Sequence, residues 1–275
     1  MAGTLYVVAT PLGNLGDLSP RAADTLKRVA VVVAEDTRHS KPLLVHAGSH
    51  AELVSFHAHS SERALERILR ILTDGRDVAL ITDAGTPAIS DPGVALVAAA
   101  RERGIQVVTI PGPTAVAASL SVSGIGGDRY LFLGFLPRKG SDRRRLLLTA
   151  AQSEWTVVLF EAPNRVTQLL ADLIEVCGPE RQVAVSRELT KVFEETRAGP
   201  LQELSEHYAE APVRGEVTVV LAGTGKPRVE DRPPDPGERA RALLAEGLSR
   251  KDVAHRLAEE TGISRNTAYR LVSEL

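Results

Sequence analysis

The chain has 275 residues, of which 43% are hydrophobic and 25% charged, and its formal net charge is −2. This length can bury one large core or two moderate ones. A single cysteine, Cys177, excludes an internal disulfide and is typical of a reducing compartment. No apolar run approaches the roughly 20 residues of a membrane helix, and no basic region precedes Leu5, so we expect a cytoplasmic protein.

Apolar strand-like runs alternate with helical patterns over the first part of the chain. Strands are expected at residues 5–9, 29–34, 53–56, 78–82 and 106–110, with a helix at 61–72. This alternation predicts an α/β lobe over residues 1–117.

The pattern continues into a second α/β lobe, predicted over residues 118–225. Its strands are expected at 130–133, 156–160, 182–186 and 216–221, and its helices near 143–152 and 166–176. Cys177 follows the apolar pattern of the second helix, so we interpret it as a buried structural thiol rather than a nucleophile. Residues 226–237 contain four prolines among charged residues, which predicts a stiff linker.

Residues 238–275 are predicted to form a helix-turn-helix-like module. Ser249 would cap a helix over 250–260 and Ser264 would cap a second helix. The first helix would turn three apolar residues inward, namely Val253, Ala254 and Leu257. The second would present residue types that reach phosphates and base edges, namely Arg265, Asn266, Thr267 and Arg270. A module used only for packing is the alternative, because acidic residues nearly balance basic ones there.

Three of the expected strands run into stiff turns rich in glycine and proline. The turns cover residues 10–17, 83–93 and 111–115. Such residues often do no more than connect elements. In open α/β sheets, however, ligands bind beyond the carboxyl ends of the strands. Three such turns therefore predict one shared pocket.

Seven sequence blocks occur in order between about residues 3 and 223: ATPLGNLGD, AEDTR, TDAGTPAISDPG, IPGPTA, GFLPRKG, EAPNR and RELTKVFEE. Together they resemble the ribosomal RNA small-subunit methyltransferase I family of the tetrapyrrole methylase superfamily. The resemblance implies two α/β lobes with a cofactor cleft between them. It also implies a homodimer that uses S-adenosylmethionine to methylate the 2′-hydroxyl of a cytidine in 16S ribosomal RNA, either free or in the small ribosomal subunit.

The resemblance places cofactor contacts in the three turns and after the last strand, at Leu12, Asp83, Ala84, Gly85, Ala88, Thr114, Ala115, Leu221 and Ala222. A base would help because a protonated ribose hydroxyl is a poor nucleophile. The candidates for this base lie in family blocks at strand ends and are Lys191, Glu161 and Asp36. Each could instead form a structural ion pair, with Arg38, Arg165 or Arg187.

An RNA-binding protein with a negative net charge must cluster its cations. The best cluster follows Pro137 and consists of Arg138, Lys139, Arg143, Arg144 and Arg145. A solvated helix face is the alternative interpretation of this run. The other RNA-binding candidates are Arg38, His57, His59, Arg165, Arg187, Arg265 and Arg270. The family has a similar His-x-His block followed by Asn-Glu, where this chain has Ser60 and Ser61.

Other functions would require different sequence features. No metal is expected, because the histidines near residues 46–59 lack a Cys or carboxylate at ligand spacing. A methyltransferase acting on a tetrapyrrole or another small molecule would have a Gly-rich first turn and lack the AEDTR and RELTK blocks. A metabolite-sensing regulator would bind DNA through the C-terminal module, whereas the enzyme would act on ribosomal RNA.

Overall fold

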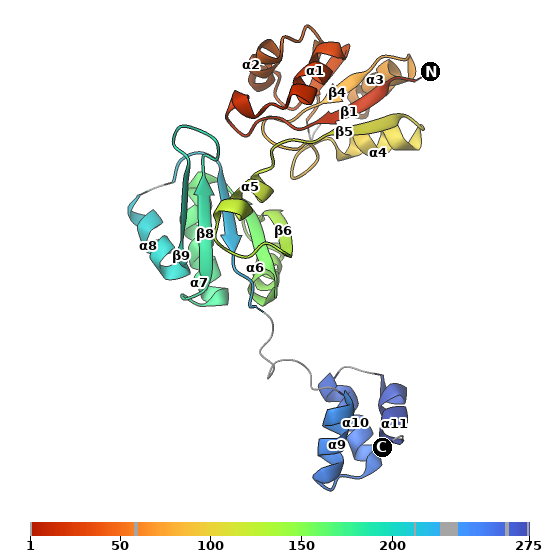
Figure 1. Cartoon of the computed structure of the whole chain (residues 1–275), viewed down its shortest axis with the longest axis vertical. Coiled ribbons are helices and arrows are strands. Elements are labelled where there is room, and N and C mark those ends of the chain that lie inside the picture. Colours follow the sequence, from red (N-terminus) through yellow and green to blue (C-terminus); the bar gives the residue numbers. More distant parts are fainter. Residues whose placement is uncertain (1, 58–59, 212, 226–235, 262–263, 274) are drawn as a thin grey trace. The chain divides into compact units, whose positions relative to one another are not determined.

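The computed structural model describes residues 2–57, 60–211, 213–225, 236–261, 264–273 and 275. The chain forms two compact units, residues 1–223 and 224–275. The first unit contains two five-stranded sheets with helices packed on them, and the described part of the second is helical (Figure 1).

The first sheet is parallel throughout and has the order β3-β2-β4-β1-β5. Its strands are β1 (Thr4–Val8), β2 (Val31–Ala34), β3 (Glu52–Ser55), β4 (Val78–Leu80) and β5 (Gln106–Ile110). Its helices are α1 (Pro20–Arg28), α2 (Thr37–Ala47), α3 (Glu62–Thr73) and α4 (Val94–Glu102). Leu26 and Leu44 pack with Val32 on one face, and Leu69 and Leu96 pack in the cluster on the other. Because both faces are buried, the strands are apolar runs without alternation.

The second sheet has the order β6-β7-β10-β8-β9 and is mixed. Its strands are β6 (Tyr130–Phe135), β7 (Thr156–Glu161), β8 (Gln182–Arg187), β9 (Glu195–Pro200) and β10 (Val217–Leu221). One face is covered by α6 (Ser141–Gln152), α7 (Val166–Cys177) and α8 (Leu201–Glu210). The other face carries α5 (Ala115–Val122), whose Val116 packs against Val158 and Val220. The central strand β10 runs antiparallel to both of its neighbours.

A β-bulge in β6 shifts the register with β7 between Phe132 and Gly134. Gly134 has a φ of 62°, a conformation that costs a residue without a Cβ little. The extra residue places both Phe132 and Phe135 on the side of Phe160. Their ring centroids lie 4.9 and 5.5 Å from that of Phe160.

The predicted α/β class with two lobes is confirmed, with some differences in detail. The boundary expected after Ala117 falls inside α5, which packs on the second sheet. Strand β9 was not expected from its sequence, ETRAGP, because an edge strand exposed on one side needs no apolar alternation. Cys177 is half-buried against the core at the end of α7, and burial raises the pKa of its thiol.

The second unit contains α9 (Pro236–Ala245), α10 (Arg250–Thr261) and α11 (Arg265–Ser273). Ser249 and Ser264 cap α10 and α11, since each hydroxyl accepts a hydrogen bond from a backbone N–H three residues later, at 3.2 Å. The residues expected to point inward, Val253, Ala254 and Leu257, are fully buried. Of the expected linker, residues 226–235 lie outside the described part of the chain, and Pro236 and Gly237 begin α9.

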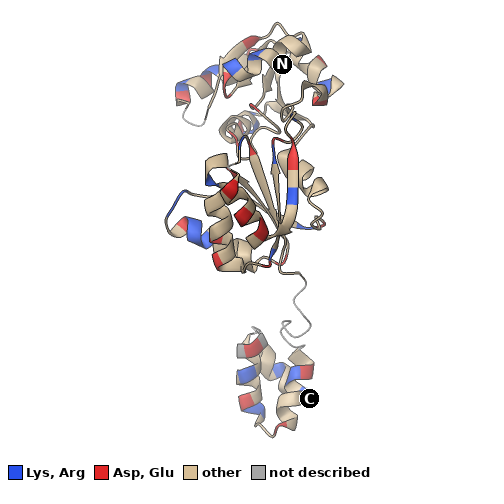
Figure 2. Cartoon of the chain, turned by 90° about the vertical axis from the view of Figure 1, so that its left-hand side faces the viewer, with Lys and Arg blue, Asp and Glu red and all other residues tan. Residues whose placement is uncertain are grey.

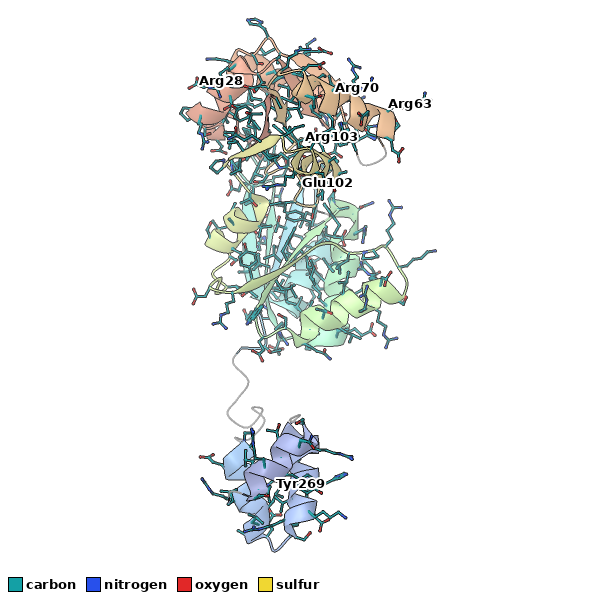
Figure 3. The ribbon with its side chains drawn as sticks, turned by 90° about the vertical axis from the view of Figure 1, so that its right-hand side faces the viewer. Arg28, Arg63, Arg70, Glu102, Arg103 and Tyr269 are labelled. Carbon is teal, nitrogen blue, oxygen red and sulfur yellow. The ribbon has the colours of Figure 1, made fainter. Side chains whose placement is uncertain are left out.

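Charges of both signs are interspersed on some helices, such as α3 and α10. The helices α7 and α8, in contrast, carry Asp and Glu but no Lys or Arg (Figure 2). Arg70 on α3 and Arg103 just after α4, both labelled in Figure 3, form ion pairs with Glu66 of α3, and the shortest N–O distance is 2.6 Å for Arg103. Among the described residues, no helix is long and apolar enough to cross a membrane.

Candidate active site

A pocket of about 560 Å³ is lined by residues from both sheets of the first unit. Its volume is within the range of sites that bind small molecules and cofactors. The first sheet contributes the turns after β1, β4 and β5. The second contributes the ends of β6 and β7, the loop after β8 and the start of β10.

Hydrogen bonds connect the three turns that the sequence singles out. Thr10 and Gly85 exchange two backbone hydrogen bonds of 2.8 and 3.1 Å between the first and second turns. The Thr86 hydroxyl donates to the carbonyl of Pro113 in the third turn at 3.3 Å. Gly85 has a φ of 84°, and a Cβ there would lie 3.3 Å from Leu12 Cδ2. The three turns thus form one continuous wall.

Six of the nine expected cofactor-contact residues line this pocket: Leu12, Asp83, Ala84, Gly85, Thr114 and Ala115. Ala88 lies in the loop after β4 with a φ of 67° and is not among the lining residues. Leu221 and Ala222 are at the opposite end of the second sheet. Leu221 pairs with the first half of β7 and is fully buried in the core.

The expectation for Leu221 and Ala222 differs from the position of this pocket for a topological reason. It assumed that the pocket lies at the carboxyl end of the last strand, as in a parallel sheet. Because β10 is antiparallel to β7 and β8, its amino end faces the pocket instead. Val217 and Thr218 therefore line the cavity where Leu221 was expected.

The pocket carries six carboxylates, contributed by Glu35, Asp83, Asp91, Glu161, Glu188 and Glu216. Burial raises the pKa of Asp91 to about 6, and the nearby carboxylates of Glu35 and Asp83 contribute to this rise. Burial and then the charge of Asp83 also raise the pKa of Glu35. A cationic ligand would therefore bind favourably among these carboxylates, because its charge would compensate theirs.

Lys191 enters the pocket from the loop after β8. Its Nζ lies 3.0 Å from Glu188 Oε1 and 3.1 Å from Glu216 Oε2. Burial lowers the pKa of Lys191, but the hydrogen bonds to these two glutamates outweigh it, so the net shift is upward. A lysine held as a cation in this way is a poor general base.

Glu161 closes the end of β7 and its side chain is fully buried. Oε1 accepts a hydrogen bond from the Ala162 backbone N–H at 2.9 Å and forms an ion pair with Arg165, whose Nε lies 3.1 Å away. Arg143 lies 4.0 Å from Oε2, which has no hydrogen-bond partner among the described residues. Since an unpaired buried oxygen is costly, Oε2 is available to a donor on a ligand.

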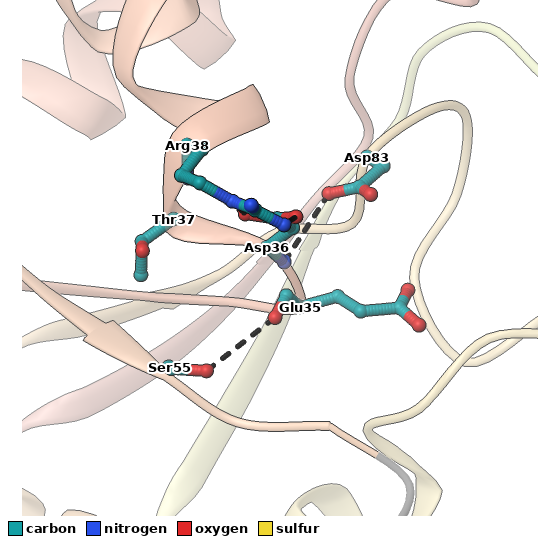
Figure 4. A pocket seen from close by; sticks show the side chains of 6 residues that line it. All are labelled: Glu35, Asp36, Thr37, Arg38, Ser55 and Asp83. Atoms are coloured by element: carbon teal, nitrogen blue, oxygen red, sulfur yellow. Dashed lines mark hydrogen bonds and ion pairs between the residues drawn. The ribbon is translucent and has the colours of Figure 1, made fainter.

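Asp36 belongs to a neighbouring pocket of about 410 Å³ rather than to the main one. Figure 4 shows the Arg38 guanidinium lying over the Asp36 carboxylate, with contacts of 2.7 and 3.1 Å. The Asp36 backbone N–H donates to Asp83 at 3.3 Å. The Arg38 hydrogen bonds hold the pKa of Asp36 well below its usual range, which makes this carboxylate a weak base.

Burial distinguishes one residue of the basic cluster after Pro137 from the other four. Arg138, Lys139, Arg144 and Arg145 are exposed, and Arg145 contacts Asp142 at 3.0 Å. The side chain of Arg143 is only 9% exposed, and it donates to Asp172 at 2.6 Å and to the Pro137 carbonyl at 3.0 Å. Arg143 therefore does not fit the RNA-binding role expected of it, because its guanidinium joins α6 to α7.

Two more of the expected RNA-binding residues are held by acidic partners. Arg165 contacts Glu161 and donates to the Leu136 carbonyl, and Arg187 lies 2.6 Å from Glu195. Their side chains are about a quarter exposed. A structural ion pair was the alternative to a catalytic role for each candidate base. Asp36 forms such a pair with Arg38, and Glu161 forms one with Arg165. Lys191 pairs with two glutamates instead.

The remaining candidates are at the surface. His57 is exposed and close enough for its charge to influence Glu35, and His59 lies outside the described residues. Arg265 and Arg270 are exposed on α11, where Arg265 contacts His255 at 3.2 Å. Among the described residues, no group of three His, Cys, Asp or Glu side chains could hold a metal ion.

Several residues that line the pocket are not among those expected from the sequence, including Asp91, Phe135, Phe160 and Glu216. Asp91 stands in the same Gly/Pro-rich block as Asp83, directly before Pro92, so its position was an available signal. Glu216 precedes the antiparallel strand and carried no comparable signal.

Comparisons with known proteins agree with this architecture. Residues 4–205 match the family described as Tetrapyrrole (Corrin/Porphyrin) Methylases. Ribosomal RNA small subunit methyltransferase I of Synechocystis sp. is 44% identical over 99% of this chain and 98% of its own length. The protein of the same name from Pseudomonas aeruginosa is 45% identical over 98% of this chain and 96% of its own.

A solved structure of uroporphyrin-III C-methyl transferase from Thermus thermophilus, complexed with S-adenyl homocysteine, shares the fold. Its TM-score is 0.59 at 21% identity, with coverage of 80% of this chain and 97% of that one. The chain thus belongs to the tetrapyrrole methylase family and, within it, to the ribosomal RNA small subunit methyltransferase I family.

Proposed function

We propose that this protein uses S-adenosylmethionine to methylate the ribose 2′-hydroxyl of a cytidine in the 16S ribosomal RNA of the small subunit. The observation that carries the proposal is the pocket shared by both sheets, in a chain whose full-length relatives bear the name of a ribosomal RNA methyltransferase. A tetrapyrrole substrate is less well supported, because the solved enzymes that act on such molecules are similar to this chain at about 20% identity only.

The pocket residues fit S-adenosylmethionine. Leu12, Ile89 and Ala115 offer apolar surface, and the carboxylates of Asp83 and Asp91 complement a cationic sulfonium. Glu161 Oε2 can accept a hydrogen bond from an amino group. When bound, the cofactor supplies an electrophilic methyl group, and the pocket's task is to hold the ribose oxygen in line with it.

Asp91 is the residue we propose as proton acceptor for the ribose hydroxyl. It lines the pocket, and its raised pKa of about 6 is closer to neutral pH than that of an ordinary aspartate. Lys191 is paired with two glutamates and Asp36 lies outside the pocket, so neither suits this role. Glu161 we assign to cofactor binding.

The cations that we propose to bind RNA phosphates are exposed and are Arg138, Lys139, Arg144, Arg265 and Arg270. The helical unit would serve as an additional RNA contact, since α11 presents Arg265 and Arg270. We also propose a cytoplasmic homodimer, as two-fold dimers are the commonest oligomers. Light scattering that gives the 29.4 kDa mass of one chain would contradict the dimer.

The experiment that tests the function uses small ribosomal subunits purified from a strain in which the gene is deleted. The protein and S-adenosylmethionine are added, and the ribosomal RNA nucleosides are then analysed by mass spectrometry. Appearance of 2′-O-methylcytidine is the expected result. A methylated base, or no methylation of ribosomal RNA, would contradict the proposal.

A further inference from the structure

The loop between β8 and β9 presents two apolar side chains to solvent next to the pocket. Val192 is 93% exposed and Phe193 is 71% exposed. They immediately follow Lys191, which lines the pocket. Scattered exposed apolar residues are common on proteins. Two adjacent residues with such exposure at the edge of a site, however, indicate a surface that binds a ligand or another molecule.

The loop is built as two consecutive tight turns. The Lys191 N–H donates to the Glu188 carbonyl at 2.9 Å, and the Glu194 N–H donates to the Lys191 carbonyl at 3.1 Å. Val192 and Phe193 therefore occupy the two corner positions of the second turn. Turn corners favour Gly, Pro, Asn and Asp, so a Val-Phe pair is not explained by turn formation.

Several contacts hold this loop in place. Glu188 and Thr190 have φ values of 50° and 68°, which are costly for residues with a Cβ and persist only when their surroundings fix them. The Thr190 N–H donates to the Glu194 carboxylate at 2.7 Å. Leu189, in the same loop, is buried, with 8% of its surface exposed. The apolar corner is consequently presented on a fixed support rather than on a flexible tip.

We propose that Phe193 is the stacking platform for the base of the nucleotide whose ribose enters the pocket. The inference rests on the proposed function. A ribose hydroxyl can reach a pocket of this kind only if its nucleotide leaves the RNA stack, and the base then loses its stacking neighbours. An exposed aromatic ring two residues from Lys191 replaces them, and Val192 extends the apolar surface. Phe193 is thus a positioning residue for the target nucleotide.

The test compares Phe193→Leu with Phe193→Tyr in the full-length protein. Methylation kinetics are measured on small subunits from the deletion strain, and the affinity for S-adenosylhomocysteine is measured by calorimetry. Loss of base stacking should lower kcat/KM of Phe193→Leu by about tenfold or more, mainly through KM for the subunit, while Phe193→Tyr stays within about twofold of the unchanged protein. Cofactor affinity should be the same in all three proteins.

A matched control is Trp155→Leu, which removes a 47% exposed aromatic ring just before the start of β7, at the end of that strand away from Glu161. It should leave kcat/KM unchanged. Equal kinetics for Phe193→Leu and the unchanged protein would overturn the inference, and so would a change in cofactor affinity. A shift from dimer to monomer in Phe193→Leu would assign the loop to an interface between two copies instead. If the unchanged protein fails to methylate the subunit, the proposed function fails, not this inference alone.

Discussion

Gly13 and Lys191 lie against each other at the rim of the pocket, although one follows β1 and the other follows β8. A Cβ on Gly13 would lie 2.6 Å from Cε and 2.9 Å from Cδ of Lys191. Glycine is therefore required here for close approach rather than for its backbone freedom. The absent side chain lets Lys191 reach Glu188 and Glu216.

Replacing Gly13 with alanine should displace Lys191 from its two glutamates. We expect the affinity for S-adenosylhomocysteine to fall by about fivefold, because two pocket carboxylates lose their cation. The free energy of unfolding should change by less than about 1 kcal/mol, since Lys191 is an adaptable side chain. Gly126→Ala is the control, because a Cβ at that residue meets nothing within 4 Å. Calorimetry and thermal unfolding of both variants are the measurements, and equal behaviour of the two would contradict the assignment.

Filling the pocket should prevent cofactor binding. Ala115 begins α5 in the pocket wall, so Ala115→Leu should reduce the affinity for S-adenosylhomocysteine by about a hundredfold or more through steric exclusion. Ala117→Leu adds the same volume to an exposed position of the same helix and should bind normally. Titration calorimetry distinguishes the two variants. Normal binding by Ala115→Leu would place the cofactor elsewhere.

The ionisation of Asp91 should make cofactor selection depend on pH. Its pKa is raised to about 6, so the group is mostly neutral at about pH 5 and charged at about pH 7.5. Only S-adenosylmethionine carries a sulfonium, so its affinity relative to S-adenosylhomocysteine should increase by about two- to fivefold over this interval. Asp91→Asn should abolish the change, and it should also remove an ionisation near pH 6 from the profile of kcat. A ratio independent of pH in the unchanged protein would refute this.

The same shift predicts a change in stability. Since the folded state binds the Asp91 proton more tightly than the unfolded chain does, this group's contribution to stability is greatest below the unfolded pKa of 3.8 and declines as the pH rises through 6. The unfolding temperature of Asp91→Asn minus that of the unchanged protein should therefore be larger at neutral pH than at acid pH. Calorimetric unfolding at both pH values tests the sign.

Arg143 and Arg144 are neighbours in sequence with opposite expected effects. Arg143→Met leaves Asp172 without its main partner and should reduce the free energy of unfolding by about 3 kcal/mol. Arg144→Ala should leave stability unchanged within about 0.5 kcal/mol and weaken RNA binding in low salt. Denaturant unfolding and filter binding to 16S ribosomal RNA separate these outcomes. Reduced stability in Arg144→Ala would show that its exposed guanidinium is structural.

The helical unit should contribute to RNA binding without affecting the cofactor. Replacing Arg265 and Arg270 with alanine should reduce the slope of log affinity against log salt by about two units, one for each phosphate contact. The affinity for S-adenosylhomocysteine should not change, as every pocket residue precedes Gly223. Arg241 on α9 and Arg250 at the start of α10 are both exposed and provide a matched double substitution. An unchanged slope in the Arg265 and Arg270 variant would indicate that the helical unit serves only for packing.

The sequence allowed most of the strands to be predicted, because buried strands such as β5 are continuous apolar runs. The convergence of the three turns was also predictable, since it follows from the shared direction of parallel strands. Strand direction in the second sheet was not predictable from local pattern. This is why Leu221 was placed at the pocket and Val217 was not. The burial of Arg143 depends on Asp172, which is 29 residues away, so no local pattern distinguishes it from Arg144.

The bulge in β6 restricts how this chain can change in evolution. Phe132 and Phe135 are three residues apart in the sequence. They share a face of the sheet only because one residue between them is extra and breaks the strict alternation of the strand. Deleting the extra residue, Leu133, would restore a regular strand in which Phe135 still lies opposite Phe160. Inserting one further residue between Tyr130 and Gly134 would instead shift the strand by one position, turning Phe135 away from the pocket and Leu136 out of the core that it occupies. Substitutions in this strand should therefore be tolerated far more readily than insertions, so that descendants of this gene can lose one residue of the segment but not gain one.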